Sequence, residues 1–285
     1  MVSLTLIVLT IAGLCVSFVC AVNTPVSKDN IHIGDKDWEW WFAEKGSPMF
    51  HFALANGNSQ CYPTWPWRPD GSKTPPAEMD NWPNIRGCKK PDNNLGFKYT
   101  WGVPMPVYFT VRECENRSRR GNGTKEVRVT YGLFYEKDGF FSNGHDYDWE
   151  NVVVTWRQFG DNFLKDEIWV SAHHGGKKKI GWENVPQTAD PSNWLEDGGK
   201  NNDHARVYVG WCKHAMFFDR AGIKDVLSCL TDLEYRTHDW YYVARNKSDL
   251  LNASPGTKYW DKFVNEEWGK AWSKPSNEYW ASCDR

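Results

Sequence analysis

The sequence lacks several features that would indicate common classes of function. It has no basic excess, because 34 lysines and arginines stand against 36 acidic residues and the net charge is −2. A chain with this balance has no strong overall positive field to attract nucleic acid or anionic lipid. The motifs GxSxG and HExxH are also absent, so no short motif indicates a serine hydrolase or a zinc protease.

Only one apolar run is long enough to cross a bilayer, and it lies at the amino terminus. Residues 1–22 carry no charge, and a Val-Cys-Ala ending suits cleavage by signal peptidase after Ala21. We therefore expect residues 1–21 to be a signal peptide and residues 22–285 to form a secreted, extracellular protein. The alternative is an uncleaved membrane anchor, since no Lys or Arg stands in the first few residues.

The chain has no CxxC pair, which argues against a structural zinc site. Six of the 8 cysteines follow the signal peptide, and an even set is typical of disulfides in an exported protein. We expect the local disulfides Cys61–Cys88 and Cys212–Cys229, which leaves Cys114 to pair with Cys283. Four N-glycosylation sequons would mark surface loops in such a protein, at Asn116, Asn122, Asn246 and Asn252.

The chain shows no fixed-period repeat and no linker between two cores. Residues 61–96 hold too much Pro, Gly, Asn and Asp for a long helix or a central strand, and residues 177–203 also have the composition of surface loops. The remaining patterns predict one mostly-β domain, a β-sandwich with peripheral helices and long disulfide-pinned loops. β-Branched and aromatic residues predict strands at 106–112, 127–135, 151–157, 167–172 and 205–211, with β-like residues again at 235–245. Helical spacing of apolar residues predicts an amphipathic helix within 256–282 that ends before Pro275, and a weaker helix over 213–233.

The densest group of ionisable residues is the heptapeptide GHDYDWE at residues 144–150, just before an apolar strand. Side chains alternate along a strand, so Asp148 and Glu150 share one face. Trp149 then points to the opposite face. Two carboxylates thus face the same side at the entrance to a buried strand.

Two further residues join this group if the strands at 127–135 and 151–157 form a hairpin. Asp138 would then lie in the connecting loop, and Gly144 would let the chain turn so that His145 returns to the same face. Three carboxylates in one place repel one another, and a divalent cation relieves that repulsion. Oxygen-rich ligation with one histidine suits Mg²⁺ or Ca²⁺, with Mn²⁺ as a third option. The alternative is a solvated strand end that binds nothing.

The heptapeptide and the strand that follows it, NVVVTW, resemble the GHRHDWE motif and strand of the NLP family. This family comprises the necrosis- and ethylene-inducing-peptide-like cytolysins that plant-associated fungi, oomycetes and bacteria secrete. Further segments are similar in the same order: FHFALANGNSQCYP at 50–63, LFYEKD at 133–138, SAHHGG at 171–176 and HARVYVGW at 204–211. The resemblance implies an actinoporin-like β-sandwich with a divalent metal at one end.

The resemblance also implies roles for individual residues. Four match the metal site of the family: Asp138, His145, Asp148 and Glu150. Two histidines and one tryptophan match residues that line the ligand site: His173, His204 and Trp149. The extra histidine in SAHHGG leaves His173 and His174 as alternatives.

The chain departs from the family at several places, and its loop from Asp138 to His145 is one residue shorter than expected. Asp146 and Tyr147 stand where the family has Arg and His, and residues 61–96 form an insert with no counterpart that we can place. We expect metal binding to survive these departures. Target recognition and toxicity need not survive them, because the family includes members that are not cytotoxic.

The resemblance implies a secreted, non-enzymatic cytolysin. In the family, the metal site engages the sugar headgroup of glycosyl inositol phosphorylceramides, sphingolipids of plant membranes, and membrane damage follows. We therefore expect a monomer that binds this headgroup at the outer membrane surface. One alternative is a non-cytotoxic glycan- or lipid-binding protein, which the altered heptapeptide and the 18 tryptophans also suit. A metal-dependent glycan hydrolase that uses Asp148 and Glu150 is the other alternative.

Overall fold

The computed structural model describes eleven stretches of the chain: residues 23–27, 37–54, 62–79, 105–115, 125–139, 144–172, 176–190, 199–211, 213–219, 234–235 and 241–284. Several features expected from the sequence lie outside these stretches. They are the signal peptide, the disulfides Cys61–Cys88 and Cys212–Cys229, His173 and His174, and the sequons at Asn116 and Asn122.

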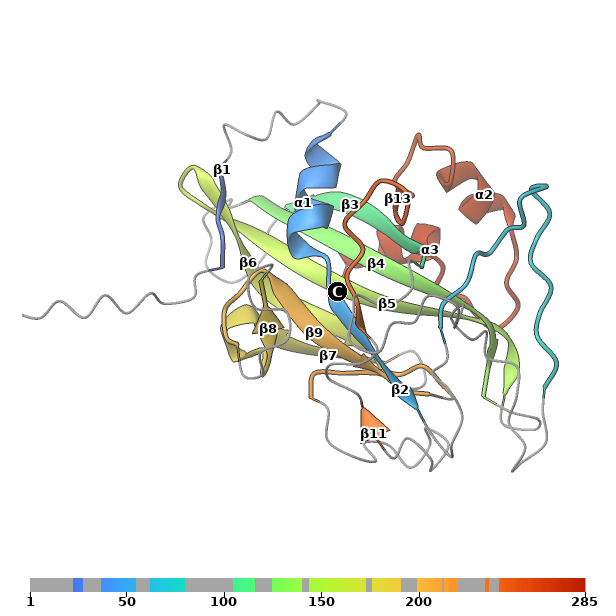
Figure 1. Cartoon of the computed structure of the whole chain (residues 1–285). Coiled ribbons are helices and arrows are strands. Elements are labelled where there is room, and N and C mark those ends of the chain that lie inside the picture. Colours follow the sequence, from blue (N-terminus) through green and yellow to red (C-terminus); the bar gives the residue numbers. More distant parts are fainter. Residues whose placement is uncertain are drawn as a thin grey trace, which may run out of the picture.

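The larger of two sheets is built on an antiparallel meander of four long strands (Figure 1). These strands are β3 (Val107–Glu115), β4 (Lys125–Asp138), β5 (His145–Phe159) and β6 (Asn162–Ser171). The short strands β1 (Val26–Ser27) and β7 (Lys177–Gly181) pair with β6, and β13 (Leu250–Asn252) pairs with β3 in parallel. Val127 lies opposite Trp156 and Tyr135 opposite Asp148, so the predicted hairpin between residues 127–135 and 151–157 is present within the longer β4–β5 pair.

The second sheet centres on a parallel pair, β2 (Met49–Leu54) and β9 (His204–Val209). Its other strands are β8 (Thr188–Ala189), β10 (Met216–Phe217), β11 (Glu234–Tyr235) and β12 (Tyr241–Tyr242). Apolar side chains of both sheets form one buried core, for example Val129 and Val154 from the larger sheet with Phe50 and Val207 from the smaller one. The prediction of a mostly-β sandwich is confirmed.

Within the described stretches, three α-helices lie at the margins of the sheets: α1 (Trp38–Gly46), α2 (Trp260–Asn265) and α3 (Pro275–Ser282), with a 3₁₀ turn at η5 (Trp182–Asn184). The single helix predicted within 256–282 is wrong, because the chain leaves α2 after Asn265 and Gly269 has a positive φ of 57°. Pro275 begins α3, since a first-turn proline lacks only an N–H that would have no helical partner. No helix among the described residues is long and apolar enough to cross a membrane.

Two predicted loop or helix regions contain strands instead. Within residues 177–203, three lysines form most of β7, which pairs with β6 at the edge of the larger sheet. Lysines are common on edge strands because their charge discourages pairing with strands of other molecules. The helix predicted over 213–233 is wrong where the chain is described, because Met216–Phe217 pairs with β9 as strand β10.

The two described sequons differ in their surroundings. Asn246 is exposed in the turn before β13. Asn252 lies within β13 rather than in a loop, and its Nδ2 donates a hydrogen bond to Glu39 Oε2 at 2.5 Å. The expected surface loop at Asn252 is therefore wrong, while its glycosylation stays a prediction.

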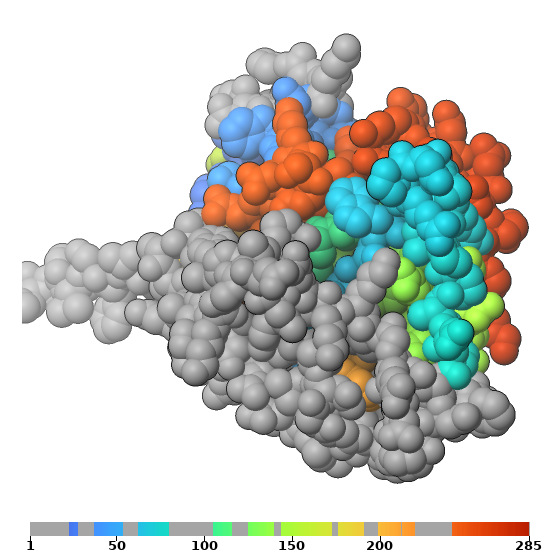
Figure 2. Space-filling view, turned by 45° about the vertical axis from the view of Figure 1, so that its right-hand side comes forward, coloured from blue at the N-terminus to red at the C-terminus, as the bar shows by residue number. Residues whose placement is uncertain are grey.

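Residues 62–79, the described part of the insert at 61–96, contain no helix or regular strand, as predicted. They lie against the carboxyl-terminal segment on the face shown in Figure 2. Two backbone hydrogen bonds fasten them to β4, from Thr64 N to Phe134 O at 2.9 Å and from Ala77 N to Glu136 O at 3.1 Å. The insert is therefore part of the packed structure where it is described.

The disulfide between Cys114 and Cys283, which the sequence left as the third pair, ties the end of β3 to the end of α3 across 169 residues of sequence. Replacing both cysteines by alanine should lower the free energy of unfolding by about 2–4 kcal/mol, because the unfolded chain gains conformational freedom. Urea denaturation of the two oxidised proteins measures the difference.

Reduction provides the control for lost packing, since Cys114 is buried. With reductant present, the unfolding free energies of the parent protein and the double variant should differ much less than they do under oxidising conditions. Equal unfolding free energies in the oxidised state would contradict a stabilising role for this disulfide.

Candidate functional site

A cavity of about 450 Å³ opens where the β4–β5 hairpin projects beyond the core. All four residues predicted to bind a metal line it, namely Asp138, His145, Asp148 and Glu150. Ser171 of β6, Lys213, and residues 270–273 between α2 and α3 complete much of the wall. Segments that are distant in sequence thus enclose the acidic residues of a single hairpin.

The register of the hairpin and one unusual backbone conformation bring these side chains together. Asp138 is the last residue of β4, not part of the loop as predicted, and it lies opposite His145. Tyr147 has a φ of +60°, so the extended backbone is interrupted between His145 and Asp148. His145 Nδ1 donates to the carbonyl oxygen of Tyr147 at 2.9 Å, because a carbonyl can only accept. In the neutral ring the lone pair then resides on Nε2, which lies 3.4 Å from Asp138 Oδ2.

His214, which the sequence did not assign to the site, completes the tightest group of potential ligands. One ligand atom each from Asp138, Asp148 and His214 lies within 4.8 Å of the other two. His214 Nδ1 is 3.0 Å from Asp148 Oδ2, and its ring stacks on Tyr135 with centroids 3.7 Å apart. Its φ is +52°, and such strained residues cluster at functional sites where packing enforces them.

The prediction that His204 lines the site is wrong. His204 is the first residue of β9, and its Nδ1 lies 2.7 Å from the carbonyl oxygen of Ser47. His214 follows the opposite end of this strand, so the length of β9, roughly 20 Å, separates the two positions. No residue of the segment HARVYVGW lines the cavity, and Lys213, just beyond its far end, does. The signal in the sequence was the Lys-His pair just after this strand.

The other two predicted lining residues have different outcomes. Trp149 borders the cavity, but its ring lies among Phe134, Phe263 and Trp268 on the opposite face of the sheet, as strand alternation predicted. His173 lies outside the described residues, and Ala172 and Gly176, the described residues nearest to it in sequence, line the cavity.

Burial keeps the acids of this cavity from ionising readily. It raises the pKa of Asp138 to about 7, and repulsion by Asp148 adds to the effect. Burial also raises the pKa of Asp148 to about 7, against the opposing influence of His145. The pKa of Glu150 is raised well above its ordinary value by burial and then by the other two acids. The pKa of His214 is lowered to about 4 by burial, so its imidazole is neutral at pH 7.

This donor set fits a hard divalent cation. Asp138 Oδ1 is buried and has no hydrogen-bond partner among the described residues, although it lies beside a second carboxylate and an imidazole. An unpartnered buried acceptor is costly, and a cation would satisfy it while relieving the repulsion between the acids. Carboxylate oxygens with one neutral imidazole suit Mg²⁺, Ca²⁺ or Mn²⁺ better than they suit a thiolate-preferring metal.

Comparison with known proteins gives matches among solved structures. No family model and no curated protein matches the chain. The structure of NLPPya in complex with mannosamine is 16% identical, covers 86% of this chain and 89% of that chain, and has a TM-score of 0.42. The structure of the non-toxic HaNLP3 protein is 15% identical, covers 88% of this chain and 86% of that chain, and also has a TM-score of 0.42.

The chain is similar to NLP proteins. At 15–16% identity and a TM-score of 0.42, this similarity assigns neither ligand nor activity. Tyr147 stands where the NLP heptapeptide has histidine. Its ring packs on Phe134 and Trp268, and Lys73 Nζ lies 4.5 Å from its centroid.

Replacing Asp148 by asparagine should weaken binding of Mg²⁺ and Ca²⁺ by roughly 100-fold, because a buried ligand oxygen and its charge are lost. Isothermal titration calorimetry of the metal-free protein measures this. Asp146→Asn is the matched control, since Asp146 is exposed two residues away and does not line the cavity. Equal affinities of the two variants would argue against a metal at this site.

A second pair of variants tests which histidine belongs to the site. Asparagine tolerates a positive φ, so His214→Asn should keep the backbone at that position while lowering metal affinity. His204→Asn removes a histidine of equal burial outside the cavity and should leave metal affinity unchanged. Loss of affinity in His204→Asn alone would contradict the placement of His214.

Metal affinity should depend on pH in a definite direction. Because the pKa values of Asp138 and Asp148 are both about 7, these groups hold protons below that pH, and a cation must displace them. The apparent affinity for Mg²⁺ should therefore weaken as the pH falls from about 8 to about 6, with protons released on binding. Calorimetry in buffers of different ionisation enthalpy counts these protons. Affinity that does not change over this range would contradict the raised pKa values.

Proposed function

We propose that this chain is a secreted, non-enzymatic protein that holds a divalent cation at the β4–β5 hairpin and binds through it the sugar headgroup of a plant membrane sphingolipid, damaging the membrane. One observation supports this proposal above all. Buried carboxylates converge with a neutral histidine in a cavity that is open enough, at about 450 Å³, to admit a ligand. The resemblance of the sequence motifs to the NLP family supplies the class of ligand.

The residues of the acidic cavity have distinct roles in this proposal. Asp138, Asp148 and His214 would hold the cation, with His145 beside Asp138 and Glu150 on the same wall. The cation would supply a Lewis acid that coordinates hydroxyl groups of the sugar. The protein supplies a fixed, largely buried set of donors that need not rearrange when the ligand arrives.

The rim of the cavity suits a sugar at a membrane surface. Lys213 and Lys270 border it, and both can donate hydrogen bonds to hydroxyl or phosphate oxygens. Trp272 lies beside them and is 52% exposed. An exposed indole offers an apolar face for a sugar ring, and tryptophan also favours the membrane–water interface.

The arrangement of the acids favours binding over hydrolysis. A glycoside hydrolase needs two carboxyl groups that flank the scissile bond. Asp148 and Glu150 instead share a face of one strand, and both repel Asp138 strongly enough to help raise pKa values in the group. Acids that converge on one point serve a cation better than they serve two sides of a substrate.

A second candidate is a glycan- or lipid-binding protein that does not lyse membranes, and the surroundings of Tyr147 favour it. The ring packs into an aromatic cluster and lies under Lys73 of the insert. The side chain that replaces the family's histidine is thus occupied in packing, and the insert covers part of this edge of the hairpin. Recognition at this edge should differ from that of cytolytic NLP proteins.

Dye release from vesicles distinguishes the two candidates. Vesicles that contain plant glycosyl inositol phosphorylceramide should leak when the protein and Mg²⁺ or Ca²⁺ are present. Leakage should stop with EDTA or with Asp148→Asn, and should persist with Asp146→Asn. Binding without leakage would favour the second candidate. Failure to bind these vesicles with any divalent cation would overturn the proposed ligand.

A further inference from the structure

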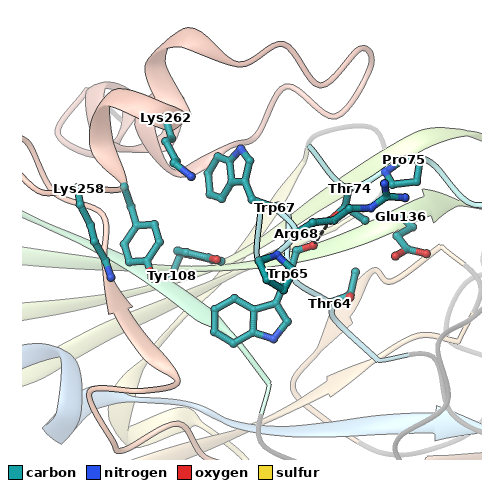
Figure 3. Close-up of a pocket in the computed structure, with 12 residues that line it drawn as sticks. Thr64, Trp65, Trp67, Arg68, Thr74, Pro75, Tyr108, Glu136, Lys258 and Lys262 are labelled. Carbon is teal, nitrogen blue, oxygen red and sulfur yellow. Dashed lines mark hydrogen bonds between the residues drawn. The ribbon is translucent and has the colours of Figure 1, made fainter. Parts of the chain in front are cut away.

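A second cavity, of about 720 Å³, lies between the insert and the carboxyl-terminal segment that contains α2 (Figure 3). Trp65, Trp67 and Arg68 of the insert line one side, and Lys258 and Lys262 line the other. Tyr108 of β3 also lines it. The volume is within the range of roughly 300–1,000 Å³ that is usual for small-molecule sites. Its position does not overlap the acidic cavity, since the two share no lining residue.

The cavity carries three cations, Arg68, Lys258 and Lys262, against one lining carboxylate, that of Glu136. Among the residues that the structure describes, none of Arg68, Lys258 and Lys262 forms an ion pair. Lys262 Nζ lies 5.0 Å from the ring centroid of Trp67, and Lys258 Nζ lies 4.7 Å from that of Tyr259. Aromatic faces thus position the two ammonium groups without neutralising them.

The cations are spread along the cavity. Figure 3 shows Lys258 and the guanidinium group of Arg68 toward opposite ends, with Trp65 between them. Asp70, the acid in the turn of Arg68, is turned to Ser72, whose backbone N–H and hydroxyl donate to its Oδ1 at 2.9 and 2.6 Å. A ligand that uses all three cations must therefore carry more than one negative group along its length.

The floor and wall of this cavity also carry aromatic and hydrogen-bonding side chains. Tyr108 is wholly buried, and its hydroxyl has no hydrogen-bond partner among the described residues. Trp65 is 45% exposed, so one part of its ring is open to a ligand. Glu136 also lines the cavity and adds a carboxylate that can accept hydrogen bonds from hydroxyl groups.

These features together select a class of ligand. A compact anion such as phosphate would satisfy one cation but would leave Trp65 and most of the cavity without contacts. A neutral sugar would stack on Trp65 but leave three cations unpaired. We propose that this cavity binds an acidic oligosaccharide, a short chain of sugar rings that carry carboxylate or sulfate groups. The rings lie against Trp65, the anionic groups face Arg68, Lys258 and Lys262, and ring hydroxyls face Glu136.

Calorimetry with defined oligosaccharides tests this proposal on the full mature protein with EDTA present. The probes are a tetrasaccharide of uronic acids, a sulfated tetrasaccharide and a neutral tetrasaccharide. At least one acidic probe should bind about tenfold or more tightly than the neutral probe, with an affinity that falls as salt is added. Trp65→Ala and Lys262→Ala should each weaken this binding by about tenfold.

Two matched variants control for surface effects. Trp280→Ala removes a tryptophan that is 59% exposed on α3, and Lys179→Ala removes a lysine whose side chain is 60% exposed on β7. Both positions lie outside the cavity and should leave binding unchanged. Equal binding of acidic and neutral probes, no binding of either acidic probe, or equal losses in the control variants would overturn the proposal.

One further variant separates this site from the metal-dependent function. Asp148→Asn should keep full affinity for the acidic probe even though it loses metal binding. If the acidic probe binds while vesicles do not leak, the second cavity stands and the cytolysin proposal fails. If binding of the acidic probe is lost with Asp148→Asn or requires a divalent cation, the probe occupies the metal centre and the second-site proposal fails.

Discussion

Repulsion among buried carboxylates is the constraint on which the site depends. Asp138 and Asp148 lie beside each other where burial disfavours their charged forms, and Glu150 adds a third acid nearby. Such a group is tolerable only when protons or a cation neutralise it. The end of a long hairpin is a suitable place for it, because the sheet behind the hairpin is fixed by packing while the cavity in front stays open.

A cluster of aromatic side chains on the other face of the hairpin holds this arrangement in place. Trp149 alternates with Asp148 and Glu150 along β5 and packs on Phe134 and Trp268. Trp67 of the insert packs on the same cluster. The acidic cavity and the second cavity therefore both border this aromatic cluster, and the insert supports the hairpin as well as lining its own cavity.

The fold was more predictable than the site, for a physical reason that particular elements make clear. Central strands such as β4 and β5 have strong local signals, because β-branched and aromatic residues fit the pleated, buried surface. β7 was missed because its three lysines have no buried face of their own and form a strand only through pairing with β6. The single helix expected within 256–282 was wrong because sequence spacing does not show where tertiary contacts divide an apolar segment into two helices.

The sequence by itself determined the hairpin and the acids that it carries, since alternation and turn chemistry act within some thirty neighbouring residues. Only the tertiary structure decided which histidine joins them. His214 and His204 flank the same strand, and local pattern cannot tell which end of that strand faces the hairpin of the other sheet. The same holds for the second cavity, because Arg68 and Lys262 line it together although nearly two hundred residues of chain separate them. Long-range packing, which no short sequence pattern encodes, determines both the histidine of the acidic cavity and the lining of the second cavity.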